Sequence, residues 1–329
     1  MSLSDSINSI PDLEEYKKLL DKLFQRTRTM TVVDEIGNLF YDTVRINLKM
    51  VRLLPQQAAN NFYVYRSREI KKELTANLSS VGTFAYPPSS DCTENGRLNL
   101  AGYPAFYGSD QVSTALAETH LTEACVRFLS VWSISSPEDV GSSSFLTKQL
   151  PERNLWKMFV PSNYNEMIKM ARKTAPDKIP QLEYGYNWIN RLFEIENEPY
   201  PLTSCLGHDL LYQTNAMIQM GAIFKRAKVN LVIYPSYVTR RNTCNIAINP
   251  GFVNRHMRLL RVYRLYISNV TGDNFSYEVM SVGIRDRNHI SWHEATEQEK
   301  IDGIKTPRKI KGKLVWVPTK KQIPQDGAR

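Results

Sequence analysis

The sequence contains no long apolar run, no paired cysteines and no apolar leader. No stretch approaches the roughly 18 apolar residues that a membrane-spanning helix needs. The N-terminus lacks the basic-then-apolar layout of a secretory signal. The four cysteines lie far apart without a Cys-x-x-Cys pair, which indicates neither a disulfide framework nor a zinc site. We therefore expect a cytoplasmic, reduced protein that does not enter a membrane.

Two common ligand-binding motifs are also missing. The glycines form neither a G-x-G-x-x-G nor a Walker pattern, so the sequence gives no support for a Rossmann or P-loop nucleotide site. His289 and His293 are four residues apart, but their surroundings do not form the His-Glu-x-x-His motif of a metalloprotease. We therefore expect no metal.

The composition is that of a globular protein with an excess of positive charge. Hydrophobic residues make up 42% and charged residues 23% of the 329 positions, which is enough apolar material for a sizeable core. The net charge of +9 is spread along the chain and is densest in residues 305–321. Basic residues alternate there with an apolar run, as in an edge strand protected by lysines. An acidic protein partner or RNA is the alternative use of this segment.

The first 60 residues are predicted to form a helical N-terminal extension. Apolar residues recur at three-and-four spacing over about 13–24 and again over 33–48. Neither run carries a catalytic motif, so we expect them to pack on the main domain. A surface for a partner or for a homo-oligomer is the alternative.

The rest of the chain divides into a core and a C-terminal extension. Residues 61–250 are predicted to form the core, with a helical insertion at about 135–205, and 251–329 a β-rich basic extension. The Ser- and Gly-rich start of the insertion is predicted to be a loop. Helices are predicted over 154–174, 181–196 and 208–225, and strands over 229–234, 243–248, 257–270, 275–284 and 314–317.

One stretch, residues 95–120, carries most of the chemistry-bearing side chains. A strand is expected from Arg97 to Tyr107, and Ser109 or Asp110 is expected to cap the helix that follows. That helix carries Glu118 and is expected to continue toward residue 128. A cation, a phenol and a carboxylate should therefore gather near one edge of a sheet.

This stretch and its flanks resemble the RES domain, a family named for its Arg, Glu and Ser. Five fragments occur in the family's order, over about residues 61–249: Tyr65-Arg66, Gly96-Arg97-Leu98-Asn99 with Gly102, Phe106-Tyr107, Ala115-Leu116-Ala117-Glu118 and Tyr234-Pro235-Ser236. The resemblance implies an α+β fold of the ADP-ribosyltransferase-like type, a split, bent β-sheet with flanking helices. It also implies a toxin-like enzyme that consumes NAD as its substrate, and a cognate antitoxin of the Xre-like type.

Cleavage of the nicotinamide–ribose bond needs three kinds of side chain. The transition state resembles an oxocarbenium ion, which a carboxylate stabilises, while cations hold the pyrophosphate and an aromatic wall faces the nicotinamide. Glu118 is the predicted carboxylate, and Ser236 is predicted to act beside it through an exposed hydroxyl. The predicted NAD-binding residues are Arg66, Arg97, Tyr107 and, at the second shell, Asn245.

Each residue assignment has an ordinary structural alternative, and the expected activity has two functional alternatives. The carboxylate could be a surface glutamate, each arginine an ion-pair partner, the tyrosine a core aromatic and the serine a turn residue; Arg68 could replace Arg66. The first functional reading is NAD hydrolysis or phosphorolysis. The second is ADP-ribose transfer to a protein or nucleic acid. The third is an inactive, basic nucleic-acid-binding protein, against which the intact motif residues argue.

Overall fold

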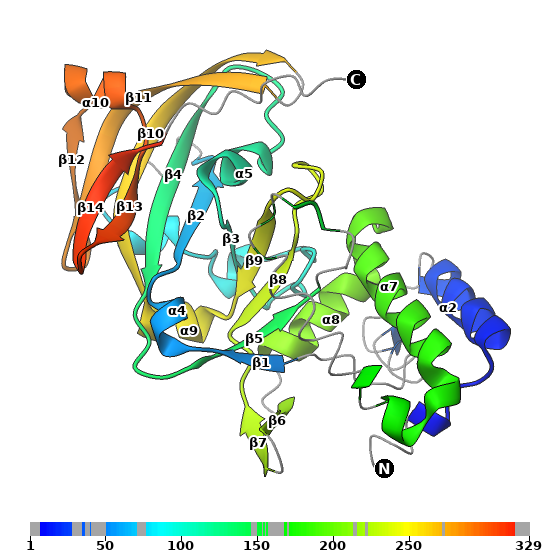
Figure 1. Ribbon diagram of the computed structural model, residues 1–329. Coiled ribbons are helices and arrows are strands. Elements are labelled where there is room, and N and C mark those ends of the chain that lie inside the picture. The colour runs from blue at the N-terminus through cyan, green and yellow to red at the C-terminus, as the bar shows by residue number, and fades with distance from the viewer. Residues whose placement is uncertain are drawn as a thin grey trace. The chain divides into compact units, whose positions relative to one another are not determined.

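The computed structural model shows a mixed α+β protein whose elements fall into two compact units (Figure 1). Unit 1 comprises Met1–Leu53, Pro87–Ala105 and Gly141–Tyr237, and unit 2 comprises Leu54–Tyr86, Phe106–Val140 and Val238–Arg329. The structure describes residues 7–319 except 28–34, 37–39, 41–50, 71–76, 146–149, 153, 155, 157–167, 170, 213–215, 221–222 and 272–273.

Unit 2 is built on an antiparallel sheet. Its strands follow the order β9-β3-β2-β4-β10-β11-β12. Their bounds are β2 Tyr63–Arg68, β3 Phe106–Ser109, β4 Cys125–Ile134, β9 Cys244–Ile248, β10 Met257–Thr271, β11 Asn274–Asp286 and β12 His289–Glu294. The predicted strands over 257–270 and 275–284 are confirmed as β10 and β11, and β10 pairs along almost all of β4.

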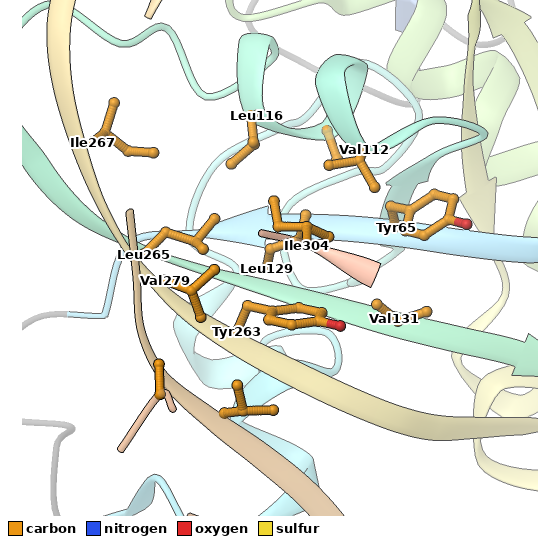
Figure 2. Packing of buried hydrophobic residues seen from close by; sticks show 13 residues of the cluster. Tyr65, Val112, Leu116, Leu129, Val131, Tyr263, Leu265, Ile267, Val279 and Ile304 are labelled. Atoms are coloured by element: carbon orange, nitrogen blue, oxygen red, sulfur yellow. The ribbon is translucent and has the colours of Figure 1, made fainter. Parts of the chain in front are cut away.

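A short helix covers part of one face of this sheet. Helix α5, Val112–Ala117, buries its apolar side chains against residues of β2, β4, β10 and β11. Figure 2 shows Val112 and Leu116 projecting from α5 toward Tyr65 and Leu129 on the strands. The cluster also contains Ala115, Val131, Tyr263, Leu265, Ile267, Val279, Val282, Ala295 and Ile304. This packing fixes where α5 ends, and Glu118 is the residue at that end.

Smaller elements complete unit 2. Helix α4 is Gln56–Ala59, the 3-10 turn η2 is Val81–Phe84, and α9, Pro250–His256, is capped by the Asn249 side chain. Helix α10, Glu297–Asp302, begins with a capping box of Thr296 and Glu299. The basic C-terminal segment forms a separate hairpin of β13, Lys305–Ile310, and β14, Lys313–Pro318. A strand was predicted over 314–317, and β14 confirms it.

Unit 1 combines three long helices with short strands. Helix α2 is Leu13–Thr27, α7 is Ile179–Ile195 and α8 is Pro201–Tyr212. Strands β1 (Val51–Leu54), β5 (Val140–Ser144) and β8 (Leu231–Pro235) are neighbours in that order, and β5 runs parallel to β8. A stack of Phe145, Phe193 and Tyr234 joins α7 to β8. The remaining elements are η3 (Ser89–Asp91), η5 (Pro176–Lys178), β6 (Ala216–Met220) and β7 (Ile223–Ala227).

Several predictions about elements are confirmed. The helices expected over 13–24 and 181–196 are α2 and α7, and the strands expected over 229–234 and 243–248 are β8 and β9. The mixed α+β class is confirmed too, while the ADP-ribosyltransferase-like arrangement stays a prediction. The helical patterns over 33–48 and 154–174 lie largely outside the described residues.

Five expectations about elements are wrong. The Ser- and Gly-rich start of the insertion contains strand β5, and the helix expected over 208–225 ends at Tyr212 and gives way to the β6–β7 hairpin. Arg97 lies in a turn outside any strand, and β3 begins only at Phe106. Helix α5 ends at Ala117, and its N-cap is Gln111, because Ser109 and Asp110 are engaged with β9.

We predict that Leu116→Ala destabilises the protein by about 2–5 kcal/mol, because it removes a buried side chain from the contact between α5 and the sheet. Leu116 is only 1% exposed. Ser113→Ala, on the exposed side of the same helix, should change stability by less than about 0.5 kcal/mol. Urea unfolding of both variants measures this, and equal midpoints would contradict the assigned packing.

Candidate functional site

Glu118 follows the last residue of α5 and is half-buried. Its backbone N–H donates to the Thr114 carbonyl at 3.0 Å, so the residue is still held by the helix. The Asn245 side chain, on β9, donates from Nδ2 to Glu118 Oε1 at 2.6 Å. The Asn245 amide thus holds and orients the Glu118 carboxylate.

Ser109 fixes the orientation of that donor. Its hydroxyl donates to Asn245 Oδ1 at 2.7 Å, and both residues are buried in adjacent strands, where they are paired in register. With its oxygen engaged by Ser109, the Asn245 amide presents its nitrogen to Glu118. Asn245, predicted as a second-shell residue, therefore contacts the predicted catalytic carboxylate directly.

The sequence interpretation missed Ser109 as a site residue, because it assigned this serine to a helix cap. Alternation along two short apolar strands was the available signal, since it puts one polar residue of each strand on the same face. Other polar contacts tie α5 to the start of β9. Asp110 Oδ1 accepts from the Cys244 N–H at 3.2 Å, and the Thr114 hydroxyl donates to that of Thr243 at 2.7 Å.

Tyr107 lies two residues before Ser109 on β3, so strand alternation directs both side chains to the face that α5 covers. The Tyr107 side chain is half-buried. Glu118, Asn245, Ser109 and Tyr107 therefore belong to one face of the unit 2 sheet. A carboxylate and an aromatic wall are two of the three groups that the predicted reaction needs.

Arg66 lies on β2, the strand that pairs with β3 on the side away from β9. Strands β2 and β3 meet at the pair Tyr65–Ser109, and Arg66 Nη1 donates to the Tyr107 carbonyl at 2.6 Å beside that pair. Tyr65 packs under α5, so the side chain of the next residue, Arg66, leaves the strand on the opposite face of the sheet. The Arg66 guanidinium lies 5.3 Å from the centre of the Phe106 ring. The structure therefore links Arg66 to Tyr107 through backbone and does not gather it on the face of Glu118.

The electrostatics of Arg66 favour an anion. Burial first, and the charge of Arg68 second, lower the pKa of Arg66 to about 9, which leaves the guanidinium charged at neutral pH. Within the described part of the chain no carboxylate pairs with it, and its Nε is buried without a hydrogen bond. Arg68, predicted as the possible substitute, donates to the Thr83 carbonyl, and burial lowers its pKa as well. Two neighbouring cations without a counter-charge are poorly stabilised unless an anion binds.

The other two predicted residues belong to unit 1. Arg97 donates from Nη1 to the Phe193 carbonyl at 2.6 Å, at the end of α7, and its guanidinium lies 4.6 Å from the Tyr200 ring. Ser236 follows β8 and is fully buried, so the expectation of an exposed hydroxyl is wrong. The contacts of Arg97 are those of a helix-end stabiliser, and its role toward NAD stays a prediction.

A buried carboxylate near Arg97 has a structural role. Glu196 accepts hydrogen bonds from the backbone N–H groups of Leu202 and Thr203, at the start of α8. Burial raises the pKa of Glu196, although these hydrogen bonds and the charge of Arg97 favour its ionised form. The group thus holds the first turn of α8, where carboxylates are favoured by the helix dipole.

No cluster of three or more His, Cys, Asp or Glu residues among the described positions is arranged to hold a metal ion. His293 has a structural partner instead, because its Nε2 lies 3.2 Å from Glu299 in the α10 capping box. None of the helices within the described ranges is long and apolar enough to cross a membrane.

Comparison with protein families and with curated proteins identifies no relative of this chain. No protein-family model matches the chain, and a search of curated proteins finds no match. The likeness to the RES domain therefore depends on the sequence fragments alone.

We predict that Asn245→Asp destabilises the protein by about 1–3 kcal/mol at pH 7, because a second carboxylate replaces the donor to Glu118. Unfolding midpoints of the variant and the parent at pH 7 measure this.

Asn254→Asp is the matched control. Asn254 is exposed on α9, and its Oδ1 accepts from the Tyr86 hydroxyl at 2.9 Å, which an Asp oxygen can also do. Its stability should therefore stay close to that of the parent. If Asn245→Asp behaved like this control, the hydrogen bond to Glu118 would not be significant in solution.

Proposed function

We propose that the chain cleaves the nicotinamide–ribose bond of NAD, with Glu118 as the carboxylate that faces the ribose. The observation that carries the proposal is the hydrogen-bonded series Ser109–Asn245–Glu118, which orients the carboxylate on the sheet face to which Tyr107 is also directed. The RES-like fragments supply the choice of NAD as substrate.

In the proposed reaction the C1′–N bond of the nicotinamide riboside breaks, and its electron pair passes to the ring nitrogen. The cationic pyridinium becomes neutral nicotinamide, so no general acid is required. Positive charge develops on the ribose, where an already oriented carboxylate stabilises it without reorganisation. Water or phosphate then bonds to C1′, and a water acceptor loses one proton.

The remaining side chains would position the substrate. Tyr107 would supply a wall for the leaving ring, whereas the role of Arg66 toward the pyrophosphate stays a prediction of the resemblance, because its side chain starts on the opposite face of the sheet. Asn245 is a positioning residue, since it acts through Glu118. Roles for Arg97 and Ser236, and a cognate antitoxin of the Xre-like type, remain predictions of the resemblance.

The test is the release of nicotinamide from NAD by the purified full chain. We expect release to fall by roughly 10²–10³ in Glu118→Gln, because a neutral amide cannot stabilise the developing cation. Glu123→Gln, an exposed position shortly after α5, should retain parental activity. A dependence on phosphate would identify a phosphorylase, and its absence a glycohydrolase.

Two outcomes would count against the proposal. Release that is equal in Glu118→Gln and the parent would remove Glu118 from the reaction. Release that requires added protein or nucleic acid would replace hydrolysis by ADP-ribose transfer. If the parent released no nicotinamide under any of these conditions, NAD cleavage itself would be wrong.

A further inference from the structure

A shallow pocket of about 310 Å³ lies on the unit 2 sheet, on the face opposite α5. Its position follows from alternation, since Leu129 and Leu265 point to α5 while the adjacent Phe128 and Arg264 point away. The lining residues are Leu78, Phe128, Arg264, Ser281, Trp292, His293 and Glu294. No step proposed for NAD uses any of them.

Four of these residues form one row across four strands. In register, Phe128 on β4 pairs with Arg264 on β10, Arg264 with Ser281 on β11, and Ser281 with Glu294 on β12. Strands are spaced about 4.8 Å apart, so Arg264 and Glu294 are about 10 Å apart at the backbone. The small Ser281, which is buried, lies between these two long charged side chains and lines the pocket with them.

The aromatic part of the pocket is held in place. Trp292 donates from Nε1 to the Leu78 carbonyl at 2.9 Å, and a Cβ added at Gly283 would lie 3.0 Å from its ring, so the indole lies directly on the glycine backbone. Its ring meets Phe128 edge to face at 6.0 Å. These contacts form a fixed apolar wall next to the charged row, as in pockets that take small planar ligands.

Arg264 and Glu294 need opposite hydrogen-bonding groups on a ligand. The Arg264 guanidinium can only donate hydrogen bonds, and among the described residues no side-chain hydrogen bond or ion pair engages it. Glu294 is exposed and, as a carboxylate, only accepts. A ligand spanning the row must therefore present acceptors at one edge and donors at the other.

We propose that this pocket binds a guanine base. The guanine O6 and N7 are adjacent acceptors that match the guanidinium fork of Arg264, and its N2 amino group is a donor for Glu294. Adenine places a donor beside N7, which would face the donors of Arg264. The pocket volume is at the lower end of the range for small-ligand sites, which suits a base rather than a whole dinucleotide.

Isothermal titration of the full chain with guanosine, inosine and adenosine tests this proposal. We expect saturable binding of guanosine, and binding of inosine weaker by about tenfold or more because inosine lacks the 2-amino group. Adenosine should bind weakest. Glu294→Gln should lower guanosine affinity by about tenfold or more, because a charge-assisted hydrogen bond is lost.

Glu297→Gln is the matched control, since Glu297 is an exposed glutamate whose carboxylate pairs with Lys300 outside the pocket. It should bind guanosine like the parent. Absence of saturable guanosine binding, equal binding of adenosine, or unchanged affinity in Glu294→Gln would overturn the assignment. The readout is binding, so the result is independent of whether the chain cleaves NAD.

Discussion

The alternation of side chains along β2 and β4 is the constraint on which unit 2 depends. Tyr65 and Leu129 must lie under α5 to close the apolar cluster, so the residues next to them, Arg66 and Phe128, are directed to the other face. One face of the sheet consequently carries the carboxylate with its amide, and the other carries the arginines and the shallow pocket. A one-residue slip of either strand would exchange these sets and bury cations against leucines.

The Asn245 amide orients Glu118 through one hydrogen bond, and the Ser109 hydroxyl in turn orients the amide. A carboxylate that is already oriented needs little reorganisation when positive charge develops on a bound substrate. Arg66 is placed differently, since its contacts are a backbone carbonyl and an aromatic ring, neither of which neutralises its charge. Its guanidinium can therefore attract an anion, on the face of the sheet opposite Glu118.

The sequence predicted those elements whose residues follow a simple period. Helix α2 and strands β8 to β11 are of this kind. Strand β5 was missed because Val-Gly-Ser-Ser-Ser has little β propensity of its own; its parallel pairing with β8 provides the stability. Ser109 was missed because a serine before a helix has two uses, as a cap or as a partner across strands. Only the register with Asn245 distinguishes them.

The Glu118–Asn245 hydrogen bond joins residues 127 positions apart, and β4, just after Glu118, pairs with β10, just after Asn245. Such long-range pairings slow folding, because large loops must close before any contact stabilises them. During synthesis the carboxylate leaves the ribosome long before its amide and before the strand that completes the sheet under α5. A chain interrupted before residue 245 therefore contains Glu118 but lacks the Asn245 amide that orients it. The order of synthesis thus makes the carboxylate present well before it can be oriented.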